Sequence, residues 1–274
     1  MKLKDINLQN LWEEEMGWNR AKSIDRLVND CVEEAFWEKN APKYSVKNNL
    51  FRNIPSLSDK ILSLIIPDSI VWEIGSGSGN FTIPIASKAK SVLGIEASKA
   101  MIQSAKIETL DKEIKNIEFI NSKWEDFQTE KKADIIISIN SLYRIKNIEF
   151  CLSKMNDLAK KRIIIARSLV RPKFFDILKN LDIEYHECND YILIPNILWK
   201  WGIYATVEYI TQNCVTRYLS ELDTERDIPD YIVGESRQKV ITEVKKRLKK
   251  DKGVFLYEYK AAFIVIHWDK CISE

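Results

Sequence analysis

Residues 71–80, V-W-E-I-G-S-G-S-G-N, decide the fold of this chain. Three of its eight glycines, Gly75, Gly77 and Gly79, stand two residues apart directly after an apolar run. The run predicts a buried strand, and the glycines predict a tight turn in which backbone can approach a ligand closely. Residues 81–89, F-T-I-P-I-A-S-K-A, predict a helix. Strand, glycine turn and helix together indicate a nucleotide-type site at the carboxyl edge of a sheet.

An acidic residue stands on each side of this turn. Glu73 precedes the glycines, and Glu96 ends the next predicted strand, 21 residues after Gly75. A carboxylate at that place is the residue type that binds both hydroxyls of a ribose. Glu73 argues against a neighbouring phosphate, because like charges repel. Asn80 also replaces the third glycine of a dinucleotide fingerprint. The site suits a ligand with adenosine, positive charge and no phosphate, and S-adenosylmethionine has these features.

The rest of the chain continues to alternate between helices and strands. Short Ile/Val-rich runs between helical patterns are typical of a parallel sheet covered on both faces. Predicted strands cover 69–75, 91–96, 117–121, 133–139, 162–169, 203–210 and 261–268. Predicted helices cover 57–66, 81–89, 99–106, 174–181, 194–202 and 235–250. Residues 1–56 predict a helical N-terminal cap, with breaks at Pro42 and Pro55.

Composition excludes several classes of protein. The chain has 274 residues, 45% hydrophobic and 30% charged, with 42 basic and 40 acidic side chains and a net charge of +2. This balance gives no strong case for binding nucleic acid or a membrane surface. Five scattered cysteines without a C-x-x-C pair indicate reduced thiols and no metal site. No signal peptide and no apolar run of 18 residues is present, so we expect a cytoplasmic protein without a membrane partner.

Two motifs resemble a known family. V-W-E-I-G-S-G-S-G-N-F-T at 71–82 and V-L-G-I-E-A-S at 92–98 are similar to the first two motifs of the class I S-adenosylmethionine-dependent methyltransferases. The resemblance covers residues 69–169. It implies an α/β fold with a Rossmann-like, mostly parallel seven-stranded sheet and an antiparallel last strand, with S-adenosylmethionine as cofactor. The chain would then comprise the cap at 1–56 and a methyltransferase domain at 57–274, with an insertion or lid around 190–260.

The resemblance also implies roles for individual residues. The glycine loop would hold the methionine part of the cofactor, Glu73 its ammonium group and Glu96 its ribose. Lys123 stands where many relatives have an acid for the adenine, so Trp124 could cover that ring and Glu125 replace the acid; Trp124 could equally be a core residue. The expected cofactor-binding residues are Tyr44, Glu73, Gly75, Ser76, Gly77, Gly79, Glu96, Ala97, Met101, Trp124, Glu125 and Asn140.

The methyl acceptor is expected to face residues 138–145, S-I-N-S-L-Y-R-I, which follow the fourth strand. Tyr143 is the first candidate for a catalytic contact, and His186 is the candidate for a general base. Arg144 would suit a carboxylate or phosphate on the acceptor. Trp199 and Trp201 could wall an apolar acceptor, although packing of a lid helix is the alternative.

Three functions remain open. A small-molecule acceptor is favoured because residues 35–45, A-F-W-E-K-N-A-P-K-Y-S, resemble a leader of small-molecule methyltransferases in which the tyrosine closes over the cofactor. Enzymes that methylate base amino groups have a proline where this chain has Leu142. Methylation of rRNA or tRNA bases is the alternative, since the first motif resembles rRNA adenine dimethyltransferases and residues 235–252 contain eight Lys/Arg. A non-catalytic S-adenosylmethionine-binding protein is the third possibility.

Overall fold

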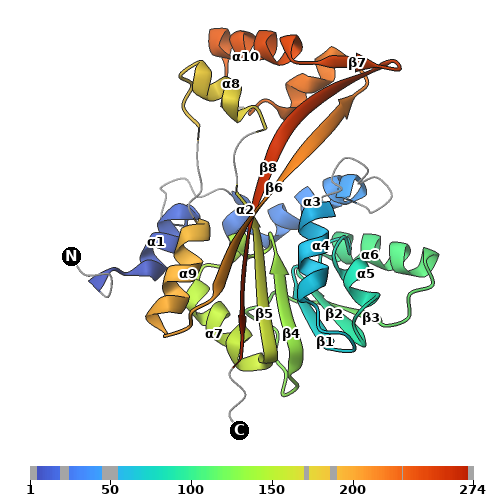
Figure 1. Cartoon of the computed structure of the whole chain (residues 1–274), viewed down its shortest axis with the longest axis vertical. Helices are drawn as coiled ribbons and strands as arrows, with labels where there is room; N and C mark the ends of the chain where they lie inside the picture. The colour runs from blue at the N-terminus through green and yellow to red at the C-terminus, as the bar shows by residue number, and fades with distance from the viewer. Residues whose placement is uncertain are drawn as a thin grey trace. The chain divides into compact units, whose positions relative to one another are not determined.

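The computed structural model describes residues 5–18, 25–44, 55–169, 173–185, 190–229 and 231–270. The chain divides into two compact units (Figure 1). The first unit comprises Met1–Arg167, Asn189–Ile210 and Phe263–Glu274, and the second comprises Ser168–Cys188 and Thr211–Ala262. The N-terminal helices therefore belong to the same unit as most of the sheet. The predicted domain division at residue 56 stays a prediction.

Five neighbouring strands of the sheet are parallel, in the order β3-β2-β1-β4-β5 from one edge. Continuous Ile and Val runs put β1, β4 and β5 in the core on both faces, as a sheet covered by helices requires. Ile135, Ile137, Ile163 and Ile165 are fully buried. These strands are β1 (Ile70–Ile74), β2 (Ser91–Glu96), β3 (Ile117–Asn121), β4 (Ala133–Ile139) and β5 (Ala159–Ser168).

The sheet continues beyond β5 with β8 (Val254–Asp269) and then β6 (Thr206–Tyr218). The amide of Leu169 donates to the carbonyl of Ala262, and the amide of Lys270 donates to the carbonyl of Lys161. In these two contacts the residue numbers rise along β5 while they fall along β8. Strand β8, the last strand in the chain, is therefore antiparallel to β5. The predicted Rossmann-like class is confirmed. The prediction of seven strands misses an eighth, β7 (Lys249–Asp251), because K-K-D has no apolar signal.

Four helices pack around the parallel strands of the first unit. They are α4 (Pro55–Leu64), α5 (Thr82–Ala86), α6 (Lys99–Asp111) and α7 (Ile148–Leu158). Both α5 and α6 contact β2 and β3, whereas α7 contacts β4. Pro84 lies in the first turn of α5, where helical amides have no partner in the helix. Helix α7 was not predicted, although its buried residues follow helical spacing.

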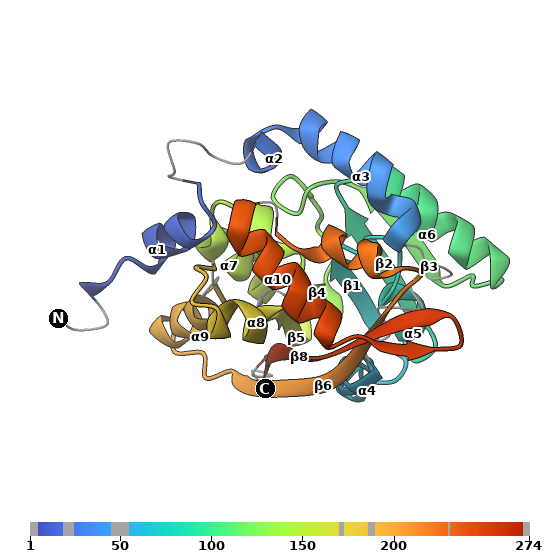
Figure 2. The ribbon, with the colours of Figure 1, turned by 90° about the horizontal axis from the view of Figure 1, so that it is seen from above.

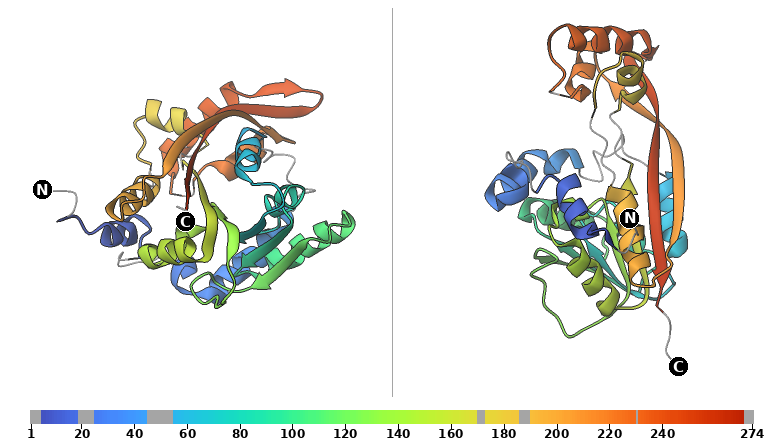
Figure 3. Two further views of the ribbon diagram at one scale, coloured as in Figure 1. Left: turned by 60° about the horizontal axis from the view of Figure 1, so that its bottom comes forward. Right: turned by 90° about the vertical axis from the view of Figure 1, so that its left-hand side faces the viewer.

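The N-terminal segment folds as α1 (Leu8–Glu15), α2 (Asp25–Val28) and α3 (Asp30–Tyr44). Helix α3 lies beside α6 (Figure 2). Helix α1 lies beside α9 (Asp190–Lys200) (Figure 3). The predicted break at Pro42 is wrong, because Pro42 lies inside α3. The proline removes one amide donor from α3, which ends two residues later at Tyr44.

The second unit has its own apolar core. It contains α8 (Phe175–Asn180), the 3₁₀ helix η4 (Glu221–Asp227) and α10 (Gly234–Lys246). Helix α10 was expected to continue to residue 250 but ends at Lys246, because residues 249–251 pair with β8 as β7. The fully or nearly buried residues of this core are Phe174, Ile177, Leu178, Tyr218, Ile228, Ile232, Val240, Ile241, Val244 and Tyr257.

The strand order reverses its direction between β1 and β4. The chain moves from β1 outward to β3 on one side and from β4 to β5 on the other. In open α/β sheets a ligand binds beside such a switch point, at the carboxyl ends of the strands. Here those ends present the glycine loop after β1 and the 3₁₀ helix η3 (Leu142–Arg144) after β4. In the described part of the chain, no helix has the length and apolarity needed to span a membrane.

Candidate functional site

The glycine loop follows β1 in a conformation that few other residues adopt. Gly75, Gly77 and Gly79 have φ angles of +67°, +54° and +86°. A Cβ atom on Gly75 would lie 2.2 Å from Cβ of Ser141, in the segment after β4. No side chain fits at position 75, so the backbone of the loop can lie directly against the side chain of Ser141. Gly79 instead faces Ile83 and Ala105, so it permits close packing of the two helices that follow β1 and β2.

Glu96 ends β2 and bridges the glycine loop to the next helix. Its carboxylate accepts hydrogen bonds from the amide of Gly77 (2.8 Å) and the amide of Ser98 (2.9 Å). Ser98 in turn caps α6 by accepting a hydrogen bond from the amide of Met101. Burial raises the pKa of Glu96, although the amides of Ser98 and Gly77 oppose this effect. The carboxylate therefore shapes the loop, and its predicted contact with a ribose stays a prediction.

Glu73 is a buried carboxyl group inside β1. Its side chain is 2% exposed and accepts a hydrogen bond from the hydroxyl of Thr82 in α5. Burial, together with the nearby charge of Glu96, raises the pKa of Glu73 to about 8. A buried carboxylate without a cation is costly, so this position fits a ligand that brings positive charge.

The loop, Glu73 and Glu96 line one cavity of about 1240 Å³. It lies entirely within the first unit and is also lined by α2, α3 and the segment after β4. The sequence-predicted residues that line it are Tyr44, Glu73, Gly75, Ser76, Gly77, Glu96, Ala97, Met101, Trp124, Glu125, Asn140, Tyr143 and Arg144.

Tyr44 and Asn80 connect the end of α3 to the glycine loop. The carbonyl of Tyr44 accepts hydrogen bonds from the hydroxyl of Ser78 and from the amide group of Asn80 (3.1 Å). The ring of Tyr44 meets that of Trp37 edge to face, with centroids 5.2 Å apart. The residue that replaces a third glycine at position 80 thus anchors the N-terminal segment to the loop.

Trp124 is both a core residue and part of the cavity wall. It is 3% exposed, its indole donates to the carbonyl of Cys151 (3.3 Å), and its ring stacks on Phe127. The ammonium of Lys154 lies 4.7 Å from the ring centroid. These contacts fix the ring of Trp124 independently of any ligand. The expected contacts of Trp124 and Glu125 with adenine stay predictions.

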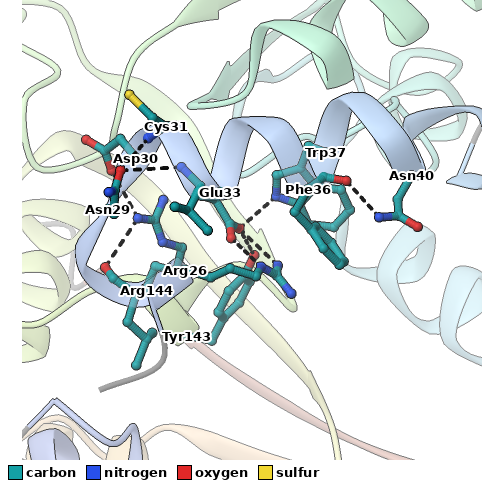
Figure 4. Close-up of polar contacts among 12 residues, drawn as sticks. Arg26, Asn29, Asp30, Cys31, Glu33, Phe36, Trp37, Asn40, Tyr143 and Arg144 are labelled. Atoms are coloured by element: carbon teal, nitrogen blue, oxygen red, sulfur yellow. Dashed lines mark hydrogen bonds and ion pairs between the residues drawn. The ribbon is translucent and has the colours of Figure 1, made fainter. Parts of the chain in front are cut away.

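The segment after β4 meets the N-terminal helices at a cluster of charged and aromatic side chains (Figure 4). Tyr143 donates a hydrogen bond to Glu33 of α3 (2.9 Å). Arg144 donates to Asp30 (3.0 Å) and to the carbonyl of Leu27 (3.2 Å). Sequence reasoning missed Glu33 and Asp30, because 110 or more residues separate them from their partners. The aromatic leader at 35–45 was the only signal near them.

The other predicted acceptor-side residues are not brought to this cavity. Trp199 and Trp201 are 53% and 39% exposed, at the end of α9 and in the turn after it, and neither lines the cavity. Their role as a substrate wall stays a prediction without support from this cavity. His186, the predicted base, lies outside the described residues. Across the described ranges, no cluster of three or more His, Cys, Asp or Glu side chains could hold a metal ion.

Comparison with known proteins agrees with this geometry. The methyltransferase-domain family matches residues 67–221, more than half of the chain. A tRNA (guanine-N(7)-)-methyltransferase of Prochlorococcus marinus is 29% identical over 134 residues, which are 48% of this chain and 59% of that protein. A ubiquinone biosynthesis O-methyltransferase of Pelagibacter ubique is 29% identical over 121 residues, 44% of this chain and 48% of that protein. The chain thus spans about half of the length of these two relatives.

A solved structure shares the fold. The magnesium protoporphyrin IX methyltransferase of Synechocystis, which has S-adenosylhomocysteine bound, is 13% identical to this chain with a TM-score of 0.51. The match covers 86% of this chain and 98% of that one. At this level of identity the likeness shows the fold and nothing finer.

Proposed function

Because the chain belongs to the class I S-adenosylmethionine-dependent methyltransferases, we propose that it transfers a methyl group to a small-molecule acceptor held in the same cavity as the cofactor. The cavity of about 1240 Å³ supports this proposal. A pocket for one small ligand has a volume of roughly 300–1,000 Å³, so this cavity has room for a second molecule. It joins the glycine loop to the Tyr143–Glu33 cluster, which supplies a separate polar wall.

The residues present fit the cofactor. The glycine loop lets backbone approach the methionine part, and Glu73 is a buried carboxyl group that an ammonium would neutralise. When bound, S-adenosylmethionine supplies an activated methyl group, so the protein has mainly to align the acceptor with it. The N-terminal helices contribute to this alignment by enclosing the cavity beside η3. In this proposal Tyr143 is the acceptor contact.

The charges of the cavity favour a small acceptor over RNA. Four of the five described basic side chains that line the cavity, Arg26, Lys123, Arg144 and Lys146, each form an ion pair with a carboxylate of the chain, and the fifth is Lys99. Cations that are already paired offer little attraction to phosphates, which provide most of the affinity of RNA-binding proteins. The relative that methylates tRNA guanine keeps RNA as the alternative acceptor.

Binding of bulk tRNA distinguishes the two acceptors. We expect no binding tighter than about 10 μM at 200 mM salt, measured by fluorescence anisotropy, because weak non-specific binding has dissociation constants near 10⁻⁴–10⁻⁶ M. A submicromolar complex that weakens steeply between 50 and 200 mM salt would contradict a small-molecule acceptor and support RNA.

Cofactor affinity should depend on pH through Glu73. Its pKa is about 8 in the free protein, and an ammonium beside it favours the ionised form, so binding releases a proton. We expect the affinity for S-adenosylhomocysteine to rise about tenfold between pH 6 and pH 7 and to level off above pH 8. Calorimetry in two buffers of different ionisation enthalpy measures the proton release. Glu73→Gln should abolish the pH dependence of the affinity. An equally steep dependence in that variant would show that a group other than Glu73 causes it.

The same group should affect the stability of the free protein. Because the pKa of Glu73 is raised from 4.5 to about 8, its contribution to stability is fully present below pH 4.5 and is lost as the pH rises through 8. Cofactor binding should offset this loss, since it stabilises the carboxylate.

A further inference from the structure

The hydroxyl group of Tyr143 has its single hydrogen engaged by the protein. It donates to Oε1 of Glu33 at 2.9 Å. Both side chains line the cavity, and Glu33 is only 5% exposed. A phenol has one hydrogen to donate, and its oxygen can accept through lone pairs. While the contact with Glu33 persists, the phenol oxygen can therefore only accept a hydrogen bond from a molecule in the cavity.

Glu33 is held as a carboxylate that cannot return a proton to the phenol. It accepts hydrogen bonds from Arg26 (2.6 and 3.2 Å) and from the indole of Trp37 (2.7 Å), as Figure 4 shows. Burial raises the pKa of Glu33, but the hydrogen bonds from Arg26, Tyr143 and Trp37 outweigh it and keep the pKa below its ordinary value. The guanidinium of Arg26 also lies 3.3 Å from the ring centroid of Phe36, which restricts it further.

The cations around Tyr143 are engaged in the same way. Arg144 is paired with Asp30 and with the carbonyl of Leu27, and Lys123 is paired with Asp30 from the other side. Arg26 is paired with Glu33. An anionic group beside Tyr143 would have to displace Asp30 or Glu33 from the cation with which it is paired. It would also lie near the negative charge of Glu33.

We propose that the wall formed by Arg26, Glu33 and Tyr143 selects methyl acceptors that present an O–H or N–H group and rejects anionic ones. Tyr143 accepts the hydrogen bond from the acceptor, and Glu33 is a positioning residue that fixes the direction of the phenol hydrogen. This proposal rests on the proposed function, because it assumes that the acceptor occupies the cavity beside the cofactor. It replaces the earlier expectation that Arg144 binds a carboxylate or phosphate.

Three matched fragments test the selection without turnover. Benzyl alcohol, benzylamine and benzoate share one ring, and only the first two can donate a hydrogen bond to Tyr143. Each is titrated against the full chain saturated with S-adenosylhomocysteine, and binding is followed by ligand-observed NMR. We expect both donors to bind at least tenfold more tightly than benzoate. Tyr143→Phe should weaken the two donors by about tenfold, the size of one hydrogen bond, and leave benzoate unchanged.

Variants of Glu33 separate positioning from a merely structural role. Glu33→Gln removes the negative charge that balances Arg26, whereas its amide oxygen can still accept the phenol hydrogen, so we expect Arg26 to attract benzoate and the preference to reverse in its favour. Glu33→Asp keeps the carboxylate and should keep the original preference. A structural role alone would weaken all three fragments together in Glu33→Gln. Glu243→Gln, at a partly exposed carboxylate on α10 that is paired with Lys246 and does not line the cavity, is the matched control.

Benzoate binding as tightly as the two donors in the unaltered protein would overturn the proposal. So would failure of both donors to bind, an unchanged affinity for them in Tyr143→Phe, or an unchanged preference in Glu33→Gln. None of these results depends on methyl transfer. If the protein methylates RNA and still prefers the two donor fragments, the proposed function fails and the selection proposal holds. If it methylates a small molecule and shows no fragment preference, the proposed function holds and the selection proposal fails.

Discussion

Replacing Gly75 by alanine is expected to abolish S-adenosylhomocysteine binding and to destabilise the first unit. The new Cβ atom would lie 2.2 Å from Cβ of Ser141, and the backbone has a φ of +67°. A left-handed conformation costs an L-residue about 1–2 kcal/mol, and forced overpacking costs about 1–3 kcal/mol. Together they predict a loss of roughly 2–5 kcal/mol in the free energy of unfolding, measured by urea denaturation. Calorimetry measures the loss of binding.

Gly202→Ala is the matched control for this variant. Gly202 also has a positive φ, +75°, but apart from its two chain neighbours no described residue has an atom within 4 Å of the position of its Cβ. It should therefore lose only about 1–2 kcal/mol through the backbone and keep its affinity for S-adenosylhomocysteine. Ser141→Gly, added to Gly75→Ala, should restore part of the binding by removing the opposing Cβ. Unchanged binding in Gly75→Ala would mean that this loop does not hold the cofactor.

Glu96→Ala should lower the affinity for S-adenosylhomocysteine by about tenfold to a thousandfold. The carboxylate accepts hydrogen bonds from the amides of Gly77 and Ser98, so its removal leaves both amides without this partner and loosens the glycine loop. The predicted contacts with the ribose are lost as well. Since a charged hydrogen bond is worth about 1.5–3 kcal/mol, one or two such contacts account for the range. Calorimetric titration measures the change.

An acidic residue on the neighbouring strand provides the control. Glu118 lies on β3, is exposed, and is paired in register with Leu93 of β2. Glu118→Ala should leave the affinity for S-adenosylhomocysteine unchanged. A folded Glu96→Ala protein with the affinity of the unaltered chain would show that Glu96 neither contacts the cofactor nor is needed to shape the loop that holds it.

The parallel part of the fold was predictable because its signals are local. Strands β2, β3 and β4 have the predicted limits, since each is an apolar run ended by a charged or polar residue. The limits of β6 and β8 were not predictable. Strand β6 continues beyond the predicted residue 210 through the mostly polar residues 211–218. Strand β8 begins at Val254, before the predicted residue 261, and its first residues pair with β7. Pairing between distant segments leaves no pattern within either one.

The candidate site divides in the same way. The glycines, Glu73 and Glu96 lie within 24 residues of one another, and their spacing alone predicts a cofactor loop. The Tyr143–Glu33 contact joins residues 110 apart, and nothing in the sequence around either residue indicates the other. Arg144 is a second example: its contact with a substrate stays a prediction, and nothing in the sequence indicates its ion pair with Asp30.

Methyl transfer from labelled S-adenosylmethionine tests the central claim most directly. The full chain is incubated with the methyl-labelled cofactor and, separately, with a metabolite extract and with bulk RNA, and Gly75→Ala serves as the inactive control. We predict that label enters compounds of the metabolite fraction with the unaltered chain alone, together with formation of S-adenosylhomocysteine. Label in RNA and none in the metabolite fraction would contradict a small-molecule acceptor, and no S-adenosylhomocysteine from either mixture would contradict methyl transfer itself.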